Sequence, residues 1–131
     1  MAPQDVNPSS APIPFALRDE ELGGIRVIAV SGELDLHTAP RLEEPLEDAF
    51  ASGDQALLID LSGCEFIDST GIALIVRAWQ RLSDGDGNGD GNRFALCCLG
   101  DQVRRLLEVS GLDSSLPTHD SRDEALAQLR G

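Results

Sequence analysis

The chain contains no lysine, and its 10 cationic residues, all arginine, stand against 23 acidic ones, for a net charge of −13. Phosphate backbones and anionic lipids repel a chain this acidic, so we predict binding neither to nucleic acid nor to a membrane surface. No stretch approaches the ~20 apolar residues that a membrane-spanning helix needs. A P-loop and a G-x-S-x-G nucleophile motif are also missing, so the sequence does not favour an enzyme.

Cysteine is scarce, with Cys64, Cys97 and Cys98 in no C-x-x-C spacing. We interpret all three as small hydrophobic residues in a reducing cytoplasm, and predict neither a metal nor a cofactor. Cys97 and Cys98 are adjacent in an apolar run, and on a regular strand their side chains are expected to point to opposite faces.

The 131 residues, of which 41% are apolar, fit a single domain with its own core. Residues 1–13 are rich in proline and small polar side chains, lack the features of a secretion signal, and are predicted to form a flexible tail. The domain is therefore expected to span residues 14–131, in the cytoplasm.

Apolar runs predict the strands. The runs at 56–61 and 94–99 are nearly continuous, which is typical of strands buried on both faces and covered by helices. A β-branched run at 26–31 is expected to pair with a short run at 15–17 as a hairpin through a turn at 20–24, because the paired glycines Gly23 and Gly24 signal a turn.

Helical spacing of apolar residues predicts helices within 38–50, 72–82, 103–107 and 121–129. Gly111 is a plausible C-terminal stop for the third helix, and Ser121 with Glu124 forms a capping box for the fourth. Pro40 suits the first turn of the first helix, whereas Pro45 lies deeper and removes a hydrogen bond. The order of elements predicts an α/β fold: a mixed four- to five-stranded sheet with about four helices packed on it.

The residues Asp68, Ser69, Thr70 and Gly71 lie where a buried strand gives way to the second helix. Three consecutive side-chain oxygens at a helix start can simply cap the free N–H groups, and Ser69 is well placed to do so. A hydroxyl at this position also suits a phosphoryl group, because free amides and the positive end of the helix dipole favour added negative charge.

Segment 66–72, preceded by 58–62, resembles the core signature of STAS domains, and more narrowly that of bacterial anti-sigma-factor antagonists. The resemblance runs from Phe15 to Arg130, and its other motifs follow in the family's order at 30–35, 38–42, 103–107 and 123–126.

This resemblance implies a phosphorylation switch. An unphosphorylated antagonist binds an anti-sigma factor that is also a serine/threonine kinase and so releases the sigma factor; phosphorylation ends the binding, and a phosphatase, expected to be of the PP2C type, restores it. By position the phosphate acceptor is Thr70. The residues expected to shape its loop and contact the partner are Asp68, Ser69, Gly71, Asp35 and Glu33.

Two other functions remain open at this point. A STAS subunit of a transporter or of a stress-sensing scaffold would bind a different partner without a phosphorylation switch. A small enzyme would need either a Cys64–His37 pair, which only residue type supports, or calcium in the insertion at 84–92. That insertion matches an EF-hand loop from Asp84 to Asp90 but has Ala95 where the bidentate glutamate is required, so we predict a flexible connector.

Overall fold

The computed structural model describes residues 14–52, 56–84 and 93–130. The predicted tail at 1–13 and the part of the insertion that follows residue 84 lie outside the described residues. In chain order the elements are β1 (Ala16–Leu22), β2 (Ile25–Leu34), α1 (Ala39–Ser52), β3 (Ala56–Ile67), α2 (Ser69–Asp84), β4 (Phe94–Cys97), α3 (Asp101–Val109), β5 (Thr118–His119) and α4 (Arg122–Arg130).

The described strands form one five-stranded sheet in the order β1-β2-β3-β4-β5. The hairpin of β1 and β2 is antiparallel, and the remaining pairs are parallel. Gly23 and Gly24 form the two-residue hairpin turn with φ of +60° and +87°, a conformation that favours glycine. The predicted mixed sheet and the predicted hairpin are confirmed.

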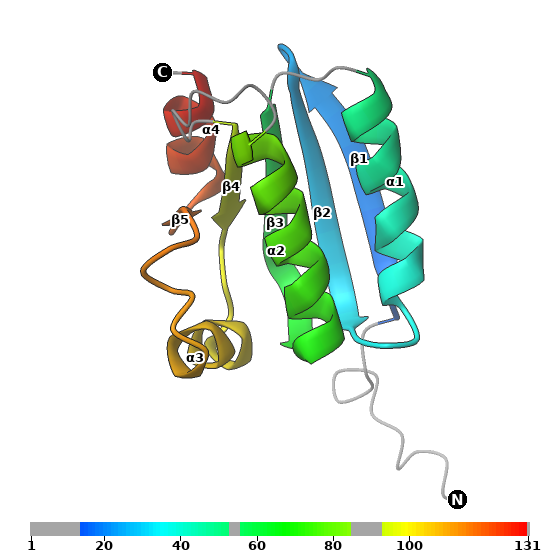
Figure 1. Cartoon of the computed structure of the whole chain (residues 1–131), viewed down its shortest axis with the longest axis vertical. Coiled ribbons are helices and arrows are strands. Elements are labelled where there is room, and N and C mark those ends of the chain that lie inside the picture. The colour runs from blue at the N-terminus through cyan, green and yellow to red at the C-terminus, as the bar shows by residue number, and fades with distance from the viewer. Residues whose placement is uncertain (1–13, 53–55, 85–92, 131) are drawn as a thin grey trace, which may run out of the picture.

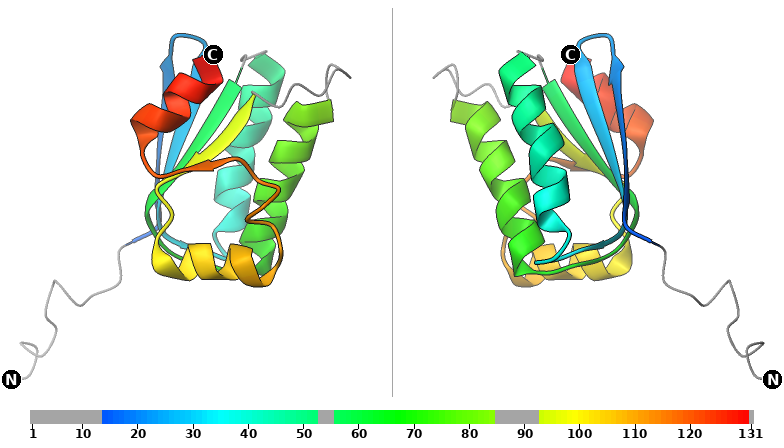
Figure 2. Two further views of the ribbon diagram at one scale, coloured as in Figure 1. Left: turned by 90° about the vertical axis from the view of Figure 1, so that its left-hand side faces the viewer. Right: turned by 90° about the vertical axis from the view of Figure 1, so that its right-hand side faces the viewer.

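The sheet separates two apolar layers of different size. In the larger layer, alternate residues of β2, β3 and β4 pack with α1, α2 and α3. The smaller layer consists of the other alternate residues, including Ile25, Val27 and Leu58, which pack with α4. Figures 1 and 2 show α1 and α2 on one face of the sheet and α4 on the other. Burial on both faces explains why residues 56–61, apart from Asp60, and residues 94–97 are apolar without alternation.

The helices begin and end close to the predicted signals. Pro45 lies inside α1, where burial of Leu42, Leu46 and Ala49 outweighs the lost hydrogen bond. After α3 the Gly111 N–H donates to the Glu108 carbonyl at 3.1 Å, with φ of +75° at Gly111, which completes the predicted stop. None of the helices in the described segments has the length and apolarity to cross a membrane.

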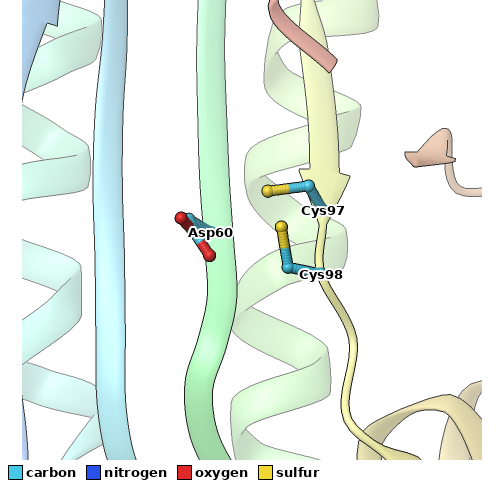
Figure 3. Close-up of side chains that lie close together, drawn as sticks. All are labelled: Asp60, Cys97 and Cys98. Carbon is cyan, nitrogen blue, oxygen red and sulfur yellow. The ribbon is translucent and has the colours of Figure 1, made fainter. Parts of the chain in front are cut away.

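The prediction that Cys97 and Cys98 point to opposite faces is wrong. Cys98 follows the last residue of β4 and has a left-handed backbone, with φ of +69°. This turn rotates its side chain back, so that both thiols lie beside Asp60 of β3 (Figure 3). Cys64 and Cys97 are buried, as expected of small hydrophobic residues, and Cys98 is half-buried.

Candidate functional site

Asp68 caps α2 at the end of β3. Its carboxylate accepts a hydrogen bond from the Gly71 N–H at 3.0 Å, and its carbonyl accepts one from the Ile72 N–H at 3.0 Å. These bonds identify Asp68 as the N-cap and make Ser69 the first residue of the helix, so the prediction that Ser69 caps α2 is wrong. Ser69 is exposed and Thr70, the second residue, is half-buried.

The second carboxylate oxygen of Asp68 holds the neighbouring loop. It accepts the Leu36 N–H at 3.2 Å, while the Asp68 N–H donates to the Leu34 carbonyl at 3.2 Å. One aspartate therefore ties the loop between β2 and α1 to the start of α2. The two strand-to-helix junctions lie side by side at the end of the sheet where α3 also lies (Figure 1).

Asp35 organises that loop. Its carboxylate accepts N–H groups of His37 at 2.9 Å and Thr38 at 3.1 Å. Partial desolvation raises the pKa of Asp35, but the hydrogen bonds from Thr38 and His37 outweigh it, and the pKa lies below its ordinary value. The Thr38 hydroxyl donates to the carbonyl of Glu33 at 2.7 Å, and the Glu33 side chain itself is exposed. The aspartate is thus ionised and held in place.

Gly71 is required by close packing. A Cβ at this position would lie 2.8 Å from the Leu34 carbonyl oxygen and 2.7 Å from Cγ1 of Ile67. Backbone of β2 and the first turn of α2 therefore meet at a distance that only glycine allows.

Gln102 of α3 also contributes, and the sequence analysis missed it. Its side-chain amide accepts the Ile67 N–H at 2.9 Å and donates to the Ile67 carbonyl at 3.1 Å. β4 pairs with β3 only as far as Asp60, so the last residue of β3 has no strand partner on that side. The backbone groups at the end of a buried strand need hydrogen-bond partners, and this need was the available signal. It does not indicate which side chain supplies the hydrogen bonds.

Three large apolar side chains are exposed in the described part of the chain, and two of them flank this site. Leu36, whose N–H bonds to Asp68, is 65% exposed, and Phe66, two residues before Asp68, is 39% exposed. Apolar groups of this size beside carboxylates are typical of a surface that a protein partner covers. We name the surface formed by Glu33, Leu36, Phe66, Asp68 and Thr70 the junction surface.

The candidate enzyme residues do not form a nucleophile site. The Cys64 thiol is buried and donates to the Phe66 carbonyl at 3.3 Å, whereas His37 is exposed in the loop before α1. Burial raises the pKa of Cys64, which leaves it as an unreactive thiol. The calcium-loop hypothesis concerns residues outside the described part of the chain.

Comparison with known proteins identifies the family of this chain. The family model described as STAS domain matches residues 16–125. The anti-sigma-F factor antagonist RsfB of Mycobacterium tuberculosis is 30% identical over 122 residues, which cover 93% of this chain and 95% of that protein. An anti-sigma F factor antagonist of Paenibacillus polymyxa is 29% identical over 107 residues, 81% of this chain and 87% of that protein.

A solved structure shows the same architecture. The crystal structure of an anti-sigma factor antagonist from Mycobacterium paratuberculosis superposes with a TM-score of 0.80 at 34% identity, and the match covers 93% of this chain and 99% of that one. The sheet order, the two helix layers and the matched span agree with the expected fold. The chain belongs to the STAS domain family.

Proposed function

We propose that this STAS domain is a cytoplasmic anti-sigma-factor antagonist. In its unphosphorylated form it binds a cognate anti-sigma factor with serine/threonine kinase activity and so releases the sigma factor. Phosphorylation of Thr70 ends that binding, and a phosphatase of the PP2C type restores it. The names of the relatives support the antagonist role, and the junction surface supports its location on the molecule.

The observation that carries the proposal is the position of Thr70. It is the half-buried second residue of α2. Asp68, two residues before it, joins the start of this helix to the loop between β2 and α1. A kinase that docks on Leu36 and Phe66 would therefore meet the hydroxyl within its own contact surface. Modification of that hydroxyl then acts directly on the contact.

Charge provides the mechanism of release. A phosphate on Thr70 adds about −1.5 to −2 charges next to Asp68, Asp35 and the exposed Glu33. The N–H groups at the start of α2 stabilise the new charge locally. The partner's surface is complementary to a neutral hydroxyl. After phosphorylation, binding would require desolvation of concentrated negative charge, and the partner is released.

The same geometry argues that the fold stays unchanged. Moving α2 would unpack Ile72, Ile75 and Ala78, which are at most 8% exposed. Exposing one large side chain costs about 1.5–3 kcal/mol, more than the ~1–2 kcal/mol that a dianion gains from a helix N-terminus. The switch is therefore an electrostatic change on a static domain.

Labelling with the cognate kinase and ATP tests the acceptor. Wild type and Ser69→Ala should be labelled and Thr70→Ala should not, because Ser69 is exposed but is not the hydroxyl that corresponds to the family's acceptor. Label that persists on Thr70→Ala would contradict the assignment. A partner captured equally well by wild type and the phosphorylated protein would favour the transporter or scaffold type of STAS domain instead.

Binding and spectra test the mechanism. Phosphorylated protein should lose at least about tenfold in affinity for the kinase, which corresponds to ~1.4 kcal/mol. Its circular dichroism and the fluorescence of Trp79, which packs against the core from α2, should stay unchanged. Thr70→Glu should reproduce the loss only in part, because a carboxylate has less charge and fewer acceptor oxygens. Altered spectra on phosphorylation would show a conformational switch.

A further inference from the structure

Asp60, Cys97 and Cys98 form a compact group of donor atoms on the opposite side of the sheet from α1 and α2. The two thiol sulfurs and a carboxylate oxygen all lie within 4.8 Å of one another. Asp60 and Cys97 are register partners on β3 and β4, and Figure 3 shows both sulfurs turned toward Asp60. We name these three residues the thiol–carboxylate cluster.

The backbone of Cys98 is the feature that builds the cluster. A regular strand would have directed the Cys98 thiol away from Cys97. Instead Cys98 adopts φ of +69°, and it is the only residue other than glycine with positive φ in the described segments. Such a conformation is unfavourable for a side chain with a Cβ, and its occurrence at the residue that completes a donor set points to a use for that set.

From this arrangement we infer that the thiol–carboxylate cluster binds one thiophilic divalent cation, with Zn²⁺ as the physiological candidate. Zn²⁺ accepts cysteine sulfur at about 2.3 Å and carboxylate oxygen at about 2.0–2.2 Å. Tetrahedral coordination at these lengths separates donor atoms by roughly 3.5–3.8 Å. The donor atoms of the cluster now lie within 4.8 Å of one another, and we expect rotation of the two cysteine side chains to close the difference.

Asp60 has capacity left for a metal. Its carboxylate accepts the Ser62 N–H at 2.9 Å and two N–H groups of Arg122, at 2.8 and 3.1 Å. A carboxylate offers about four acceptor positions, so roughly one remains. Both thiol sulfurs lie within 4.8 Å of an Asp60 oxygen. A cation between these atoms can use the remaining acceptor position without displacing Arg122.

Charge balance selects a divalent ion. With both thiols protonated, Asp60 and Arg122 cancel, and Arg122 also bonds to Glu20 at 3.0 Å toward the solvent side. Replacing two thiol protons with one dication leaves the charge of this buried site unchanged. A monovalent ion with two thiolates would leave one uncompensated negative charge, which a buried site disfavours.

Metal binding displaces the thiol protons. Coordination deprotonates a thiol outright, so binding through both cysteines should release up to two protons per metal ion.

One member of the cluster, Asp60, lines a hollow of about 440 Å³ together with Ser31, Ser62 and Arg122. We expect water in this hollow to reach the carboxylate side of the cluster and to supply the fourth ligand. Three protein ligands with one open position is a coordination that Zn²⁺ adopts.

The test is a titration of the full, tag-free chain with Co²⁺ in a non-thiol reductant, followed by displacement with Zn²⁺. Sulfur-to-cobalt charge-transfer absorption should saturate at one ion per chain and disappear when Zn²⁺ is added. Cys97→Ser and Cys98→Ser should each weaken binding by more than about a hundredfold, since even loss of outer-shell partners weakens metal sites 10- to 100-fold. Cys64→Ser is the matched control, because Cys64 lies in the other apolar layer and a serine there can still donate to the Phe66 carbonyl.

A second measurement on wild type remains informative if a variant fails to fold. Zn²⁺ should slow alkylation of the half-buried Cys98 by at least about tenfold, read peptide by peptide, relative to metal-free protein. Absence of saturable charge-transfer absorption overturns the inference. So does absorption that survives in the Cys97→Ser, Cys98→Ser double variant, because Cys64, the one remaining cysteine, would then supply the sulfur ligand.

Discussion

Two aspartates of the same segment, Asp60 within β3 and Asp68 just after it, are stabilised in different ways. Asp60 is 5% exposed, and the guanidinium of Arg122 neutralises it. Asp68 is half-buried and accepts two backbone N–H groups, one from the loop after β2 and one from the first turn of α2. Asp35 beside it is stabilised in the same way, by N–H groups and a hydroxyl.

The difference shows where charge can change. At Asp60 an ion pair balances the carboxylate, so an added charge would be uncompensated in a buried place. At the junction surface, backbone dipoles position the carboxylates while solvent screens their charge. The phosphate proposed for Thr70 would break no ion pair that the structure shows there, and its negative charge would remain available to repel a partner.

The largest effect is expected from breaking the Asp60–Arg122 pair. Arg122→Met removes the cation and two hydrogen bonds from a carboxylate that stays buried, and should lower the free energy of unfolding by about 2–4 kcal/mol. This value is below that for fully buried pairs because the Arg122 side chain is 33% exposed. Urea denaturation at pH 7 measures the loss. Arg130→Met, on the exposed last turn of the same helix, should change stability by less than about 0.5 kcal/mol.

Lowering the pH should reduce the stability difference between wild type and Arg122→Met. Desolvation raises the pKa of Asp60, but hydrogen bonds from Ser62 and the ion pair with Arg122 lower it more, so the folded-state pKa lies below the unfolded value of ~3.9. Its contribution is therefore full above pH ~4 and lost as pH falls through the lower, folded-state pKa. In Arg122→Met the ion pair is lost and only the hydrogen bonds from Ser62 still oppose the effect of burial, so protonation of Asp60 costs the variant less stability than it costs wild type. Urea midpoints of the two proteins should converge as pH falls below about 4; a constant gap would contradict the ion-pair account.

At the junction, packing should matter more than charge. Gly71→Ala places a methyl group 2.8 Å from the Leu34 carbonyl oxygen and should lower stability by about 1–3 kcal/mol. Gly100→Ala is the matched control, because its Cβ would meet nothing closer than the Cys64 carbonyl oxygen at 3.8 Å. Equal losses in thermal and urea unfolding would show that the close approach of β2 and α2 is not limiting.

The sequence predicted the fold well because its signals are local. Doubly buried strands are continuous apolar runs, a Gly-Gly pair marks the hairpin, and Ser121 with Glu124 marks the start of α4, where the Glu124 N–H donates to the Ser121 hydroxyl at 3.1 Å. The strand-to-helix junction at Asp68 was likewise visible as acceptors placed ahead of a helical stripe.

What escaped prediction depends on contacts between distant segments. Asp60 and Arg122 are 62 residues apart, and Gln102 and Ile67 are 35 apart. Nothing in the local pattern states that these side chains meet. The left-handed backbone of Cys98 was missed for another reason. Alternation of side chains between the two faces assumes a regular strand, and β4 ends at Cys97, one residue before Cys98. The capping role fell to Asp68 rather than Ser69 because the helix starts at Ser69, one residue earlier than the capping hypothesis required.

The smallest effect on stability concerns Asp68 itself. Asp68→Ala removes one N-cap bond and one loop bond, and the loss should be about 1 kcal/mol, the usual value of an N-cap. This is less than for Arg122→Met because Asp68 leaves no buried charge unpaired. Asp68→Asn keeps one acceptor oxygen and should retain the cap to Gly71 while releasing the Leu36 N–H. Amide exchange should therefore accelerate at both positions in Asp68→Ala and only at Leu36 in Asp68→Asn. If exchange accelerates at neither amide, Asp68 does not hold the loop between β2 and α1 against the start of α2, and Gly71 and Gln102 position the junction surface instead.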